Sequence, residues 1–306
     1  MLGQIFINII IPVFVLIGIG VLLDRIFKLD VETLSKLNFY VFVPALCFVK
    51  IIETQFTAGQ VGIIAGFTVL HMVVLFLLAV GLTVLPGLSV LSSHRTVFAQ
   101  SATFTNCGNF GIPFIALAVG GDAVGVMALI VVLQNFIMFT FGIWQFERGK
   151  RGSARVLLNL FKIPVVYAVL LGWLLHYLAK KSNFQTPEQV MVPLRYLSDG
   201  LIPVALLTLG VELSRSRMAK NAFPVGAASL MRLVISPLVA ILMVAIFHIK
   251  EPLSTILILA SGFPVAVNVF ILATEYKTDR EFASQSIFWT TILSAFTLSF
   301  LVYLFK

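Results

Sequence analysis

Apolar residues in this chain come in separate blocks of about 20, divided by charged residues or by Gly- and Pro-rich breaks. A helix of about 20 residues crosses the roughly 30 Å hydrocarbon core of a bilayer. The pattern therefore predicts an all-α integral membrane protein with ten transmembrane helices. The predicted spans are 4–23, 33–52, 60–85, 95–120, 122–146, 156–178, 189–212, 223–248, 252–274 and 282–304.

The amino-acid composition points to lipid as the solvent of this fold. Of the 306 residues, 59% are hydrophobic and 11% are charged, whereas charged residues make up about 25% of soluble domains. The first apolar block starts next to Met1, but it is longer than the apolar region of a signal peptide. No small-x-small cleavage site precedes Asp24. We therefore expect this block to be retained as the first membrane span.

The Lys and Arg residues lie mostly in the short connections between apolar blocks. Thirteen of the 21 fall in or beside the connections after the odd-numbered spans, and five lie on the opposite side. Connections rich in Lys and Arg face the cytoplasm. The pattern predicts a multi-pass protein of the cell inner (plasma) membrane with both termini non-cytoplasmic. Because the charges form no separate basic domain, nucleic acid is not an expected partner.

The sequence offers little support for a cofactor or for catalysis. Cys47 and Cys107 lie in apolar segments without CxxC or Cys/His spacing, so neither a disulfide framework nor a metal site is expected. HExxH, GxSxG and paired Asp-rich motifs are absent from the sequence, which argues against an intramembrane enzyme. No cofactor is predicted, and coupling to a proton or to sodium stays open.

Three short matches predict an internal repeat. Residues 11–24 and 163–176 agree at six of fourteen positions, at an offset of 152. Two further matches fall at nearly the same offset: 43–46 with 202–205, and 111–113 with 262–264. Each half then holds five spans, an odd number, so the second half enters the membrane from the opposite side. We expect two inverted five-helix repeats, 1–146 and 156–306, joined by a basic cytoplasmic connection at 147–155.

The fourth and ninth spans each contain residues that disfavour helix. Segment 105–113 has two Gly, two Asn and a Pro, and segment 261–268 has Gly262, Pro264 and Asn268 at the matching depth. Both helices are predicted to break and cross there; the alternative is that they are only kinked. Exposed backbone in hydrocarbon costs several kcal/mol per unsatisfied group, so such breaks persist where protein or a wet cavity covers them. Two facing breaks therefore predict a cavity at mid-membrane.

The predicted cavity has a lining that suits an anion. Half-helices beginning after Pro113 and Pro264 would direct their positive dipole ends into it, and Asn106, Asn109 and Asn268 would add neutral donors. We interpret the chain as a secondary transporter that works by alternating access and carries an anionic or carboxylate substrate.

Several motifs together resemble one known family. They are Asn106-x6-Pro113, Val131-Val-Leu-Gln134 with Phe146-Glu147-Arg148 nearby, and Pro264-x3-Asn268-x7-Tyr276. In combination, over essentially the whole chain, they resemble the auxin efflux carrier family, which includes plant auxin exporters and bacterial malonate or malate permeases. The resemblance implies the fold of bile-acid sodium symporters, with a scaffold of helices 1, 2, 6 and 7 and a mobile transport domain of helices 3–5 and 8–10. It also implies a homodimer with an elevator-type motion.

The resemblance further implies roles for individual residues. Asn106 matches the substrate-contacting asparagine, and Gln134 matches a polar residue on helix 5. The crossover prolines are matched by Pro113 and Pro264, with Gly111 beside the first. Two positions depart from the plant pattern, Cys47 in place of Ser and Phe139 in place of Tyr. The departures favour a small aliphatic mono- or dicarboxylate over an indole acid, and a bulkier apolar acid is the alternative.

Other polar residues within the spans have two interpretations each. Arg232 either pairs with substrate or extends its charge to the cytoplasmic surface. Asp199 either pairs with Arg195 four residues earlier or carries a proton. His71 either packs in a hydrogen-bonded setting or carries a proton. Glu212 and Glu275, near helix ends, are expected at the membrane interface. Ser101, Thr103, Thr105, Ser261, Thr290 and Thr291 either pack helices together, the favoured interpretation, or bind a cation.

Four other functions compete with organic-anion transport. An auxin-like aromatic acid is one alternative substrate, and bile-acid-like sodium-coupled transport is another. A channel needs a continuous wet path, and the spans show no polar stripe. A metabolite-sensing transceptor would signal through a partner, and the chain contains no extra domain for that purpose.

Overall fold

The computed structural model describes residues 2–54, 56–146, 164–182, 186–215 and 222–305. Within these ranges the chain is helical and forms no β-strand. The basic connection predicted at 147–155 lies outside the described residues, as does the beginning of the span predicted at 156–178.

Among the described residues, seven helical segments are long and apolar enough to cross a membrane, judged by length and composition. They coincide with seven of the predicted spans. In chain order they comprise α1 (Leu2–Ile5), η1 (Phe6–Ile10) and α2 (Ile11–Phe27); α3 (Val31–Leu37), η2 (Asn38–Phe42) and α4 (Val43–Glu53); α5 (Ala58–Val84); α9 (Ala123–Ile137), η4 (Met138–Gly142) and α10 (Ile143–Phe146); α13 (Glu188–Ser214); α14 (Ala222–Leu230), η5 (Met231–Ile235) and α15 (Ser236–Ile246); and α18 (Arg280–Phe305). Each η segment is a five-residue π-helical turn.

Proline explains most of these π-helical turns. Pro12, Pro44 and Pro237 each stand second in the α-helix that follows a π-helical turn. Proline lacks an N–H and crowds the carbonyl of the preceding turn, so a widened turn lets the helix continue past it. Side chains cap helices where the chain enters them: the Asp30 carboxylate accepts the N–H groups of Glu32 and Thr33 at the start of α3.

The two predicted breaks are present in the structure. The first lies at 104–106, between α7 (Arg95–Thr103) and the pair η3 (Cys107–Gly111) and α8 (Ile112–Ala118). The second lies at 262–267, between α16 (Leu253–Ser261) and α17 (Asn268–Glu275). The expectation that the second half of the first broken helix begins after Pro113 is wrong. That half begins at Cys107, because the π-helical turn η3 carries the helix past the proline.

One group of helices is joined by close backbone contact. α13 packs against α2 and α4, and α12 (Pro164–Ser182) packs against α4. A Cβ on Gly20 would lie 2.2 Å from the Leu207 carbonyl oxygen, and one on Gly210 would lie 2.1 Å from that of Ile17. Only glycine permits such an approach of two helix backbones.

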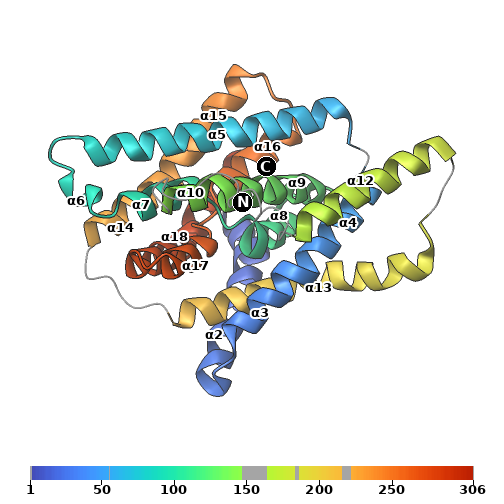
Figure 1. Ribbon diagram of the computed structural model, residues 1–306, viewed down its shortest axis with the longest axis horizontal. Helices are drawn as coiled ribbons and strands as arrows, with labels where there is room; N and C mark the ends of the chain where they lie inside the picture. The colour runs from blue at the N-terminus through green and yellow to red at the C-terminus, as the bar shows by residue number, and fades with distance from the viewer. Residues whose placement is uncertain (1, 55, 147–163, 183–185, 216–221, 306) are drawn as a thin grey trace.

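The remaining helices form a second group. α5 packs against α7 and α9, and α18 packs against α14, α16 and α17. In Figure 1 the first group lies mainly at the bottom and right of the view and the second mainly at the top and left. Element η3 of the first broken helix packs against α13, so the break lies where the two groups meet.

Candidate substrate site at the helix crossing

The two helix breaks are paired with each other. Thr105 and Val265 form an antiparallel bridge. The Asn106 N–H donates to the Pro264 carbonyl at 2.8 Å, and the Ala266 N–H donates to the Phe104 carbonyl at 3.1 Å. Backbone groups released by unwinding a helix inside a membrane need partners. Here each break supplies them to the other, which fixes the crossing point.

Side chains from neighbouring helices satisfy two more backbone groups of the breaks. The Gln134 side-chain oxygen on α9 accepts the Thr105 N–H at 3.1 Å, and its amide nitrogen donates to the Thr105 hydroxyl at 3.0 Å. On the other side, the Thr290 hydroxyl oxygen on α18 accepts the Val265 N–H at 3.1 Å. Gln134 and Thr290 thus have equivalent roles, because each accepts one backbone N–H from one of the two breaks.

Arg232 binds the C-terminal ends of α7 and α16, the half-helices that precede the two breaks. Its side chain is fully buried, at 0% exposure. The guanidinium donates to the Ala102 and Thr103 carbonyls at 2.7 and 3.2 Å, and to the Ser261 carbonyl at 2.6 Å. These carbonyls end α7 and α16, where the helix dipoles are negative. Arg232 follows neither predicted alternative, because it does not line the cavity and does not extend to the surface.

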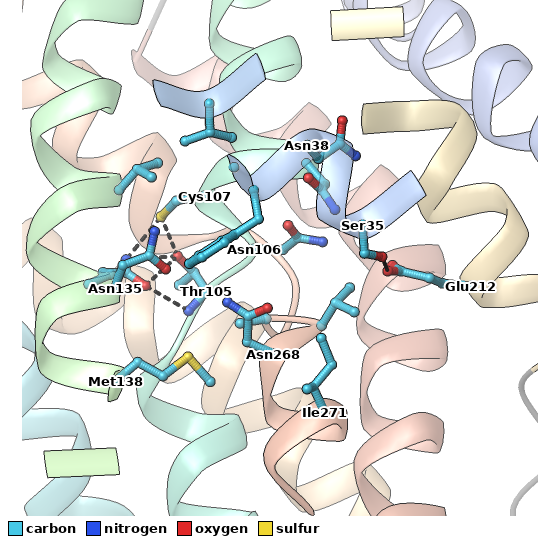
Figure 2. Close-up of a pocket in the computed structure, with 18 residues that line it drawn as sticks. Ser35, Asn38, Thr105, Asn106, Cys107, Asn135, Met138, Glu212, Asn268 and Ile271 are labelled. Carbon is cyan, nitrogen blue, oxygen red and sulfur yellow. Dashed lines mark hydrogen bonds between the residues drawn. The ribbon is translucent and has the colours of Figure 1, made fainter. Parts of the chain in front are cut away.

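A cavity of about 90 Å³ opens beside the crossing. In Figure 2, Asn135 and Met138 lie on one side of it and Ser35 and Glu212 on the other, with Asn106 between them. Amide side chains dominate its polar lining, and they come from η2, the first break, η3, α9 and α17. They are Asn38, Asn106, Asn109, Gln134, Asn135 and Asn268.

Asn106 presents an unused donor at this cavity. Its side chain is 5% exposed, and its amide nitrogen has no hydrogen-bond partner within the part of the chain that the structure describes. A buried donor without a partner costs about 1–3 kcal/mol. The first turn of η3 contributes Gly108 and Asn109 to the lining, and α17 begins at Asn268. The positive ends of two helix dipoles therefore meet at the cavity.

The predicted site residues divide into two sets. Asn106, Asn109, Gln134 and Asn268 line the cavity together.

The other predicted site residues lie behind the lining. Cys47 is buried, with its sulfur 4.0 Å from the Ala128 carbonyl. Gly111 packs against the Phe263 ring, and a Cβ there would come within 2.6 Å of it. Phe139 packs edge-on against Phe39, at 5.7 Å between ring centroids.

The two prolines that were predicted to lie at the crossing differ in position. Pro264 lies in the second break, where its carbonyl accepts the Asn106 N–H. Pro113 is buried inside α8 and has no part in the bridge between the breaks.

Two ion pairs of Arg195 replace the pairing that was predicted within α13. The expected pairing of Arg195 with Asp199 is wrong: Arg195 pairs with Glu53 at 3.1 Å and with Glu188 at 2.6 Å. These partners come within reach through helix packing and from the preceding turns of α13. Asp199 is exposed.

His71 contacts the Ser236 carbonyl at 3.0 Å and stacks on Phe67, as a packing histidine would.

The hydroxyl residues near the breaks mostly bond within their own helices. Thr103, Thr290 and Thr291 each donate to the carbonyl four residues earlier, at 2.6–2.8 Å. No cluster of three or more His, Cys, Asp or Glu residues suited to a metal ion occurs within the described ranges.

Sequence reasoning missed four polar residues of the lining. Ser35, Asn38 and Asn135 were not identified, and Glu212 was expected at the membrane interface. Glu212 instead reaches the cavity, where its carboxylate accepts a hydrogen bond from Ser35 at 3.3 Å. Ser35 and Glu212 stand 177 positions apart, so no local spacing signals their pairing. The position of Asn135, next to Gln134, is the one signal that the sequence offers.

Helices of membrane-spanning length, together with a polar cavity at paired helix breaks, define a membrane transport protein. The family described as "Membrane transport protein" matches residues 5–155 and 153–302. The chain belongs to this family, the auxin efflux carrier family that its motifs resemble. The family and the named relatives are transporters and not enzymes. The protein is therefore a multi-pass membrane transporter that acts on a small substrate.

Three relatives place the chain within the family. A Rhizobium meliloti protein named "Putative malonate transporter" is 27% identical over 310 residues, covering 98% of this chain and 95% of the relative. An uncharacterized transporter of Methanocaldococcus jannaschii is 28% identical over 192 residues, but the match covers only 59% of that relative's length. Auxin efflux carrier component 8 of Arabidopsis thaliana is 21% identical over 233 residues, covering 60% of this chain and 64% of the relative.

Proposed function

We propose that this protein is a secondary transporter that carries a small organic anion, such as malonate, across the membrane. The observation that carries the proposal is the buried amide nitrogen of Asn106, which has no partner among the described residues and belongs to a side chain that lines the cavity where the N-termini of two half-helices meet. Donors and positive dipole ends complement a carboxylate. Asn109, Asn135 and Asn268 add amide groups around the same space.

The size of the cavity favours a small substrate. Its volume of about 90 Å³ is well below the roughly 300–1,000 Å³ of pockets that hold drug-sized ligands. A short aliphatic mono- or dicarboxylate suits this space better than an indole acid does. The name of the Rhizobium meliloti relative, which specifies malonate, supports the same choice.

The two helix groups support an elevator-type mechanism. The group of α2, α4, α12 and α13 would be the scaffold, and its glycine-mediated contacts suit a rigid body. The group that contains the crossing would be the transport domain, which moves the cavity from one side of the membrane to the other. In this proposal the chain has ten membrane helices in two inverted repeats, with domains at 1–146 and 156–306 and both termini outside the cytoplasm. It works as a homodimer in the plasma membrane.

A thermal-shift screen followed by counterflow tests the proposed function. Purified protein is heated with a panel of mono- and dicarboxylates, and short dicarboxylates are expected to raise the melting temperature most. Radiolabelled malonate is then expected to accumulate in proteoliposomes preloaded with unlabelled malonate. Saturation together with counterflow identifies a carrier. Flux without saturation or counterflow would indicate a channel, and stabilisation by indole acids alone would move the substrate class to auxin-like compounds.

A further inference from the structure

Of the described residues that line the cavity, one is acidic: Glu212 of α13, which lies on the side opposite Asn135 (Figure 2). One carboxylate oxygen accepts the 3.3 Å hydrogen bond from the Ser35 hydroxyl. The other carboxylate oxygen is buried and has no hydrogen-bond partner among the described residues. The carboxyl group of this cavity-lining residue is therefore only partly satisfied.

No basic side chain balances Glu212 within the part of the chain that the structure describes. The other residues that line the cavity carry no charge, and the Cys107 thiol among them is bonded to Thr105 and Gln134. Charged and titratable groups on the elements packed against α13 are engaged elsewhere or exposed: Asp24 pairs with Arg215, Glu32 with Lys36 and Lys50 with Glu53, while Arg25 and Tyr40 are exposed. Glu275, on the cavity-lining helix α17, is exposed as well.

A charged Glu212 and a bound carboxylate would repel each other strongly. Like charges at contact distance interact far more strongly inside a membrane protein than in water. A neutral carboxyl group has the opposite effect, because its O–H donates a hydrogen bond that the anion accepts. The buried Glu212 oxygen that has no partner among the described residues keeps a lone pair for this proton.

We propose that Glu212 makes anion binding proton-linked, an inference that rests on the proposed function. When the cavity is empty and the pH is high, the carboxylate is ionised and accepts from Ser35. As an anion enters, one proton from water adds to the other oxygen of Glu212, and the resulting O–H donates to the anion. Release of the anion returns the proton to water. The protonation state of Glu212 thereby determines whether the cavity binds an anion.

Binding of malonate to the purified protein, measured by calorimetry from mildly acidic to mildly alkaline pH, tests this inference. For one linked proton, the dissociation constant of the natural protein should rise about tenfold per pH unit on the alkaline side. Glu212→Gln keeps the shape of the side chain without its charge, so its affinity should stay near the acid-side value at every pH. The matched control Glu275→Gln, at an exposed carboxylate on α17, should keep the full slope.

A second variant tests the same residue in its ionisable form. Ser35→Ala removes the hydrogen bond that stabilises the carboxylate, so tight binding should extend to higher pH. A slope retained by Glu212→Gln, or one that follows sodium rather than pH, would overturn the proton linkage and leave the proposed function intact. Failure of the natural protein to bind malonate or any other organic acid at any pH would overturn both.

Discussion

At the scale of single residues, several polar side chains inside this membrane protein form hydrogen bonds with the broken backbone. Arg232 bonds carbonyls at the ends of α7 and α16, and Gln134 bonds the first break while also lining the cavity. A buried charge in a membrane span is commonly a functional site. Here the guanidinium acts on the cavity indirectly, by holding the two half-helices that frame it.

Replacing Arg232 should therefore destabilise the fold. Arg232→Met leaves the Ala102 and Thr103 carbonyls without their side-chain donor and leaves the Ser261 carbonyl with the Ser236 hydroxyl alone. The cost is about 1–3 kcal/mol for each buried group that stays unsatisfied. We expect a clearly lower melting temperature in detergent. Arg25→Met, at an exposed arginine near the end of α2, should melt like the natural protein. An unchanged melting temperature for Arg232→Met would contradict the assigned role.

The sequence predicts residues of the cavity lining well where the signal is local. Asn106, Asn109 and Asn268 lie beside Gly and Pro in interrupted apolar blocks, so unwinding and a polar lining are expected together. Glu212 could not be assigned in this way, because its partner Ser35 comes from a helix at the other end of the chain.

At the scale of elements, the crossing depends on pairing between two breaks that lie far apart in sequence. The bridge between Thr105 and Val265 and the matching hydrogen bonds from Gln134 and Thr290 replace the helical bonds lost by unwinding. Composition predicted both breaks. It placed the first one too late, because Pro113 is accommodated by a π-helical turn and does not end the helix.

Removing one of these replacement bonds should weaken the crossing. Thr290→Val keeps the volume but leaves the Val265 N–H without its acceptor, which should cost about 1–3 kcal/mol. The neighbouring Thr291→Val is a matched control, because that hydroxyl donates only to the Ile287 carbonyl of its own helix. Equal melting temperatures for the two variants would show that the bond to the break contributes little.

The contact between α2 and α13 should be sensitive to added side-chain volume. Gly210→Ala places a Cβ about where the Ile17 carbonyl lies, at 2.1 Å, so the helices must separate, at a cost of about 1–3 kcal/mol or more. Gly18→Ala, on the open side of α2 with no atom within 4 Å, should be neutral or slightly stabilising. The yield of folded protein in size-exclusion chromatography distinguishes the two, and equal yields would argue against close packing here.

At the scale of the whole molecule, a cavity between two helix groups is the arrangement that alternating access requires. The glycine-mediated contacts of α13 and α2 join one group, and the paired breaks hold the other together. Apolar blocks of spanning length predicted the seven long helices of the described residues, because lipid imposes that length on any helix that crosses it. Hydropathy could not predict which helices pack together, because helix contacts depend on small residues and buried polar groups spread along the chain.

The central claim is that the cavity at the crossing carries the substrate, and counterflow of radiolabelled malonate with an Asn106 variant tests it most directly. Asn106→Ala removes the unpartnered donor without burying a new polar group. A hydrogen bond to a charged group contributes about 1.5–3 kcal/mol, so half-saturation should require about 10–100 times more malonate. Asn8→Ala, at an exposed amide in η1, should match the natural protein. Counterflow by Asn106→Ala at natural affinity and rate would contradict the account.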